Sequence, residues 1–121
     1  MDDKKKDDGP PLKILLADDT AVNVALATKL MKRRGHDITA VENGLLAYEA
    51  FQKESFDVIL MDIHMPVMDG LESTKKIREL ESSDPSKAPT PIIAMTANNE
   101  QSDHENYLNN GMNGIITKPL E

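Results

Sequence analysis

Short apolar runs alternate with segments of helical periodicity along most of this chain. The apolar runs predict strands near residues 12–17, 37–42, 56–61, 92–95 and 113–117. The segments between them predict helices near residues 21–34, 45–54, 70–81 and 100–110. Such alternation is typical of βαβ units, in which helices cover a parallel sheet. The pattern therefore predicts an α/β domain built around a five-stranded parallel sheet.

Individual residues support this division. The first run, 12–17, is almost continuously apolar, as expected of a strand covered on both faces. Gly35 is expected to cap the first helix, because glycine readily adopts the left-handed conformation found there. Asn43-Gly44 is expected to turn the chain into the second helix, and the Ser- and Pro-rich stretch 82–91 is expected to be a loop.

Four of the expected strands run into a polar residue that could take part in chemistry. These residues are Asp18 with Asp19, Asp62, Thr96 and Lys118. Ligands of open α/β sheets bind beyond the carboxyl ends of the strands, so distance along the sequence does not prevent these side chains from meeting. We therefore expect them to share one pocket.

Three carboxylates, a hydroxyl and an ammonium suit the transfer of a phosphoryl group to an aspartate. A carboxylate can accept that group as an acyl phosphate. Mg²⁺ prefers oxygen ligands, and Asp18, Asp19 and Asp62 would supply them. Lys118 would pair with Asp62 and later with a phosphoryl oxygen, while Thr96 would hydrogen-bond another oxygen. Each residue alone has an ordinary explanation, such as a helix cap or a turn, but the set favours a site.

The motifs around these residues resemble the receiver domain of two-component response regulators, and most of all the receivers of hybrid sensor histidine kinases. The motifs are Leu-Leu-Ala-Asp18-Asp19, Val-Ile-Leu-Met-Asp62-Ile-His-Met-Pro-Val-Met-Asp-Gly70, Pro-Ile-Ile-Ala-Met-Thr96-Ala97 and Ile-Thr-Lys118-Pro119. The resemblance to the receivers of hybrid kinases is carried by Met65-Pro-Val-Met-Asp-Gly70 within the second motif, together with Asn23, Ile77-Arg78 and Gly111-Met112. The resemblance implies a doubly wound, flavodoxin-like fold with strand order 2-1-3-4-5. It divides the chain into a disordered leader, 1–11, and a receiver domain, 12–121.

The resemblance also assigns roles in phosphoryl transfer. Asp62 is expected to be the phosphoacceptor, Thr96 the hydroxyl that moves toward the phosphoryl group, and Lys118 the ammonium beside it. The Lys118–Pro119 bond is expected to be cis. The donor would be a histidine kinase or a histidine phosphotransfer domain. Such a domain phosphorylates and dephosphorylates itself without being a turnover enzyme.

The implied cofactor is Mg²⁺. Asp19 is expected to bind the metal directly, and Asp18 largely through water. The backbone carbonyl of His64 is expected to be a further ligand. The side chain of His64 could shield the acyl phosphate, or it could simply face solvent, and the sequence does not separate these two readings.

Two features depart from the family pattern. Ile115 stands where many receivers carry Tyr or Phe, so any switching is expected to depend on Thr96 and on loop order. The chain also stops at Glu121, where the family continues into a fifth helix. One sheet face is then expected to be covered by the first helix alone, which favours a dimer or another partner there.

The sequence bears on two other functional classes. A phosphate-independent interaction module on the same fold is compatible with Ile115 and with the missing last helix. An aspartate-based phosphatase would carry a second Asp two residues after its nucleophile, where this chain has His64, so the sequence argues against that class.

Composition narrows the function further. The 121 residues carry a net charge of −7, which argues against direct nucleic-acid binding. The basic cluster 32–34 is expected to be the solvated end of a helix. The chain has no cysteine and no apolar run near the roughly 20 residues of a membrane span. A cytoplasmic location without membrane contact is therefore expected.

Overall fold

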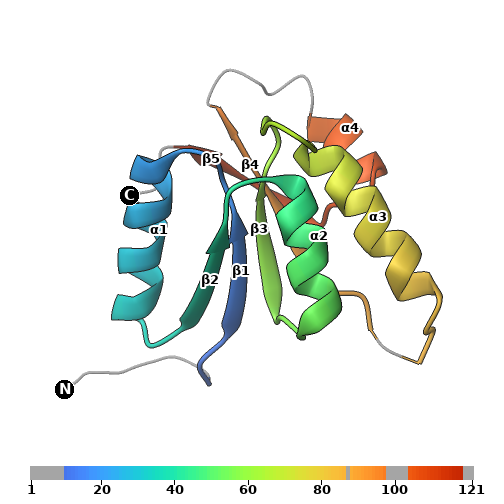
Figure 1. The fold of residues 1–121 in the computed structure, drawn as a ribbon, viewed down its shortest axis with the longest axis horizontal. Coiled ribbons are helices and arrows are strands. Elements are labelled where there is room, and N and C mark those ends of the chain that lie inside the picture. Colours follow the sequence, from blue (N-terminus) through green and yellow to red (C-terminus); the bar gives the residue numbers. More distant parts are fainter. Residues whose placement is uncertain (1–9, 87, 98–103, 119–121) are drawn as a thin grey trace.

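The computed structural model describes residues 10–86, 88–97 and 104–118 (Figure 1). The elements follow the order β1 (Lys13–Ala17), α1 (Ala21–Arg33), β2 (Asp37–Val41), α2 (Gly44–Lys53), β3 (Val58–Asp62), α3 (Gly70–Ser82), β4 (Ile92–Ala97), α4 (His104–Asn109) and β5 (Gly114–Lys118). All strand pairs are parallel and the strand order is β2-β1-β3-β4-β5. The predicted doubly wound, flavodoxin-like fold is confirmed.

Helices cover both faces of the sheet, with α1 on one side and α2, α3 and α4 on the other (Figure 1). Side chains alternate between these faces along each strand. The strand residues packed toward α2, α3 and α4 include Leu15, Ala17, Ile59, Met61, Ile92 and Ala94. Those packed toward α1 are Ile14, Leu16, Leu60 and Met95. Among the described residues, α1 is the only helix on its face.

Element boundaries differ from the sequence prediction mainly at the carboxyl ends of the strands. Asp62 is the last residue of β3, and β4 runs on past Thr96 to Ala97. Pairing with neighbouring strands explains the extension, because Asp62 still aligns with Met95 of β4. Of the expected leader, residues 1–9 lie outside the described residues, as do residues 100–103 of the last expected helix.

Side chains and glycines define the helix ends. Asn43 accepts a hydrogen bond from Leu46 N–H at 2.8 Å and caps α2, and Asp69 caps α3 by accepting from Glu72 N–H at 2.8 Å. Gly35, just after α1, has φ +87°, which confirms its expected left-handed conformation. The expected turn at Asn43-Gly44 thus starts α2, and Asp69-Gly70 starts α3 in the same way.

Arg78 joins α3 to the amino ends of β4 and β5. Its Nε donates to the Gly111 carbonyl at 2.9 Å, and its Nη1 donates to Glu81 Oε1 at 2.6 Å and to the Thr90 carbonyl at 2.9 Å. Its Nη2 donates to Asn113 Oδ1 at 2.7 Å. Arg78 therefore supports the sheet at the edge opposite the carboxyl ends of the strands.

Among the described residues, no helix is both long enough and apolar enough to cross a bilayer.

Candidate functional site

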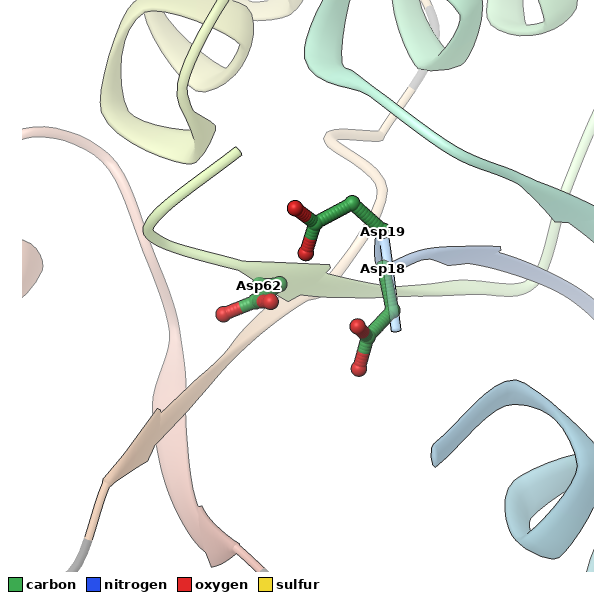
Figure 2. Close-up of side chains that lie close together, drawn as sticks. All are labelled: Asp18, Asp19 and Asp62. Atoms are coloured by element: carbon green, nitrogen blue, oxygen red, sulfur yellow. The ribbon is translucent and has the colours of Figure 1, made fainter. Parts of the chain in front are cut away.

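Three carboxylates meet at the carboxyl ends of β1 and β3. Asp18 and Asp19 directly follow β1, and Asp62 ends β3, which pairs with β1. One oxygen from each side chain lies within 4.8 Å of the others. Figure 2 shows the three side chains close together at the ends of the two strands. The structure thus brings together the three acidic residues that the sequence singled out.

Burial makes this cluster unfavourable without a counter-charge. Asp18 is 1% exposed and Asp62 is 3% exposed, whereas Asp19 is open to solvent. Asp18 Oδ1 accepts a hydrogen bond from Thr20 N–H at 2.8 Å, but Asp18 Oδ2 is buried without a hydrogen-bond partner. A buried unsatisfied acceptor costs about 1–3 kcal/mol, and more when it is charged. A hard divalent cation would satisfy this oxygen, so the donor set fits Mg²⁺.

The loop after β3 is held by close backbone contacts. Gly70 N–H donates to the Ile63 carbonyl at 2.9 Å, and Gly44 N–H donates to the Met68 carbonyl at 2.9 Å. A Cβ on Gly70 would lie 2.2 Å from the Asp62 carbonyl oxygen, so only glycine permits this approach. These contacts fix the loop that carries His64, whose side chain is exposed at its surface.

Thr96 lies on the strand next to β3. It is 1% exposed, and its Oγ1 is buried without a hydrogen-bond partner. Because Asp62 aligns with Met95, Thr96 is one residue beyond that aligned position on the neighbouring strand. A buried hydroxyl with no partner is available to a group that enters the site.

Lys118 is the last residue of β5, where its backbone aligns with Ala97 of β4. Its side chain is not among those that the structure describes, and the Lys118–Pro119 bond also lies outside the described residues. Ile115 is partly buried in β5 and packs against the cluster formed with α2, α3 and α4, as a core strand residue does.

Sequence reasoning missed the contacts that hold the site from a distance. Gly44 was read only as a turn residue, yet it binds the loop after β3 through Met68. Ser73 Oγ donates to the Gly44 carbonyl at 2.8 Å and connects α3 to the same point. No local pattern predicts such contacts, because they depend on how α2 and α3 pack together.

A doubly wound sheet with an acidic cluster at the carboxyl ends of β1 and β3 defines a receiver-type domain. The family model described as the response regulator receiver domain matches residues 14–121, and the chain belongs to that family. The chain is 40% identical over 135 aligned residues to the "Probable histidine kinase 1" of Oryza sativa subsp. indica, covering 89% of this chain. The chain spans only 14% of the length of that kinase.

Two solved structures share the fold. The receiver domain of Saccharomyces cerevisiae Ssk1, crystallised with the histidine phosphotransfer protein Ypd1, is 30% identical with a TM-score of 0.87 and covers 93% of this chain and 81% of its own. The receiver domain of the Pseudomonas aeruginosa sensor histidine kinase PA1611 is 35% identical, with a TM-score of 0.77. The match covers 93% of this chain and 88% of the PA1611 chain. That structure holds a magnesium ion coordinated in its active-site cleft.

Proposed function

We propose that this receiver domain accepts a phosphoryl group on Asp62 from a phosphohistidine donor with the help of Mg²⁺. The observation that carries the proposal is the cluster of Asp18, Asp19 and Asp62, in which one carboxylate oxygen from each residue lies within 4.8 Å of the others. The buried Asp18 Oδ2 has no hydrogen-bond partner, which is compatible with a cation site.

The chemistry of transfer follows from the chain's own residues. An oxygen of Asp62 attacks the phosphorus, the phosphorus–nitrogen bond breaks, and its electron pair returns to the donor imidazole. Asp18 and Asp19, with the backbone carbonyl of His64, would hold the cation. When bound, Mg²⁺ offsets the negative charge that would otherwise repel an anionic donor. The Asp62 carboxylate can then approach the phosphorus.

Thr96 and Lys118 are proposed to stabilise the phosphorylated state. The Thr96 hydroxyl would donate to a phosphoryl oxygen and gain the partner that it lacks here. The Lys118 ammonium would pair with a second phosphoryl oxygen. The new contacts would bias the loops at this edge toward a second arrangement, which is how a covalent mark becomes a change of surface. Water would later hydrolyse the acyl phosphate in the same site.

The proposed partner is a histidine kinase or a histidine phosphotransfer protein. The Ssk1 receiver, which is similar to this chain, was crystallised with such a protein.

We further propose a domain spanning 12–121 after a leader at 1–11, a cytoplasmic location, and no direct contact with nucleic acid. The face that carries α1 alone among the described helices is proposed as a dimer contact, which light scattering would test.

Phosphorylation is tested by incubating the protein with acetyl phosphate and Mg²⁺ and weighing it by mass spectrometry. The expected result is a gain of one phosphoryl mass that is lost in Asp62→Asn and in excess EDTA. Asp57→Asn is the matched control, because Asp57 is exposed at the opposite edge of the sheet. No gain in the unmodified protein would favour the phosphate-independent interaction module, and a gain that persists in Asp62→Asn would refute the assignment of Asp62.

A further inference from the structure

Val67, in the loop after β3, has an unfavourable backbone conformation. It is the one non-glycine residue with positive φ among those the structure describes, at +70°. Met68 N–H donates to the Pro66 carbonyl at 2.7 Å, which closes a three-residue γ-turn centred on Val67. A γ-turn with positive central φ is the rarer and more strained form, and β-branched residues tolerate positive φ poorly.

The surroundings impose this conformation on whichever residue occupies the position. Pro66 restricts the backbone before the turn. After the γ-turn, the Met68 carbonyl accepts a hydrogen bond from Gly44 N–H at 2.9 Å. The Ser73 hydroxyl fixes Gly44 by donating to the Gly44 carbonyl at 2.8 Å. Strained backbone persists where neighbouring contacts over-determine it. Glycine or asparagine would adopt the same turn with less strain, so the backbone alone does not account for valine.

The side chain of Val67 does not stabilise the fold either. It is 76% exposed, and among the described residues the other large hydrophobic residue exposed to this extent is Val22, at 75%. Val22 lies in the first turn of α1, and Val67 lies five residues after Asp62. Both elements begin at the carboxyl edge of the sheet (Figure 1), which is also the edge that carries the acidic cluster.

A protein donor must cover this surface. To bring a phosphoimidazole to Asp62, which is 3% exposed, a donor has to press its own surface against the rim of the site. An exposed valine on that rim then loses water against the donor, and burial of apolar surface favours binding. A small donor such as acetyl phosphate makes no such contact.

We propose that Val67 is a recognition residue for a histidine phosphotransfer protein, and that its side chain makes an apolar contact with that donor beside Asp62. The proposal rests on the proposed function above. The strained turn holds the side chain outward, where the core cannot use it and the donor can.

The test compares two donors and three variants. Phosphorylated Ypd1 of Saccharomyces cerevisiae is the protein donor, and acetyl phosphate is the small donor. Val67→Thr keeps the β-branched shape and the strain but replaces one methyl group by a hydroxyl, whereas Val67→Gly removes both strain and side chain. Leu12→Ser is the control, because Leu12 is an exposed apolar residue before β1, at the opposite edge of the sheet.

We expect Val67→Gly to lower kcat/KM for Ypd1 by about five- to tenfold, mainly through a higher KM, and Val67→Thr to lower it by less. The acetyl phosphate rate stays unchanged in both variants and in the control. The urea midpoint rises in Val67→Gly and is unchanged in Val67→Thr, which separates the strain from the contact.

Three outcomes would overturn the proposal while leaving the proposed function intact. They are unchanged Ypd1 kinetics in both variants, a parallel fall in the acetyl phosphate rate, and an unmodified protein that accepts phosphate from acetyl phosphate but not from Ypd1. Failure of the unmodified protein to accept phosphate from acetyl phosphate in Mg²⁺ would instead overturn the proposed function and this proposal with it.

Discussion

Replacing Asp18 by asparagine should stabilise the protein when no divalent cation is present. The substitution keeps the size of the side chain and keeps an oxygen that can accept from Thr20 N–H. It removes a buried charge whose Oδ2 has no hydrogen-bond partner and which lies in a cluster with Asp19 and Asp62. The gain in stability should therefore come almost entirely from electrostatics.

The magnitude follows from the geometry. One oxygen from each side chain of this cluster lies within 4.8 Å of the others, and two unit charges at that upper limit repel by about 3.5 kcal/mol at an effective dielectric constant of about 20. Asp19 is exposed and Asp62 has other interactions, so the net effect is smaller. We expect Asp18→Asn to raise the free energy of unfolding by about 1–3 kcal/mol. For a chain of this length, the Tm rises by about 3–5 °C per kcal/mol.

Mg²⁺ should shrink the stability advantage of the variant, and it should reverse the order where that advantage is below about 2.7 kcal/mol. A cation that binds only the folded wild-type protein adds about 2.7 kcal/mol at a concentration 100 times its Kd, and it should add much less to the variant. Thermal unfolding by circular dichroism in EDTA and across a magnesium titration measures both effects. Asp37→Asn, which changes an exposed carboxylate at the amino end of β2, controls for net charge.

Two results would refute this reasoning. A variant less stable than wild type in EDTA would mean that the Asp18 carboxylate is stabilised by contacts that outweigh the repulsion. An equal rise in Tm with Mg²⁺ for wild type and variant would mean that Asp18 takes no part in the metal site. A double-mutant cycle with Asp62→Asn would then locate the coupling energy.

Three further predictions test the framework around the site. Arg78→Ala removes four hydrogen bonds and should lower the free energy of unfolding by about 2–4 kcal/mol in urea titrations. Lys75→Ala, at an exposed position of the same helix, should change it little. Equal urea midpoints for the two variants would contradict the role given to Arg78. Gly70→Ala places a Cβ 2.2 Å from the Asp62 carbonyl oxygen and should lower the free energy of unfolding by more than about 2 kcal/mol. Gly35→Ala has open space around its Cβ and only the positive φ of +87° to oppose it, so it should lower the free energy of unfolding by only about 1 kcal/mol. Thr96→Val removes a buried hydroxyl without a partner, so it should leave the stability of the protein unchanged or higher. The same variant should slow phosphorylation by acetyl phosphate. A loss of stability would show that the hydroxyl already has a partner.

Most of the fold can be predicted from sequence because its signals are local. The run that became β1 is apolar at nearly every position, which is what coverage by helices on both faces requires. Gly35 and Asn43 define helix ends through their own backbone and side-chain properties. Boundaries were less accurate at Asp62 and Thr96, because polarity suggested a strand end where pairing with the next strand continues.

The acidic cluster was also predictable, since parallel strands place their carboxyl ends at one edge. The contacts that shape the loop after β3 were not. The hydrogen bond between Gly44 and Met68 joins residues that only the packing of α2 against α3 brings together. The left-handed conformation of Val67 was equally hidden, because valine is a residue that sequence rules exclude from such a turn.

Several departures from ordinary stability rules gather at the carboxyl edge of the sheet. Asp18, just after β1, has a buried Oδ2 without a hydrogen-bond partner, and Thr96, near the end of β4, has a buried Oγ1 without one. Val67, in the loop after β3, has a strained backbone. Thr74 on α3 also has a buried hydroxyl without a partner, and nothing in the structure explains it. A fold selected for stability alone would remove such features one by one, because each costs free energy independently. Their presence at the edge that carries Asp62 is what a site needs if a cation, a phosphoryl group and a donor surface are to supply the missing contacts.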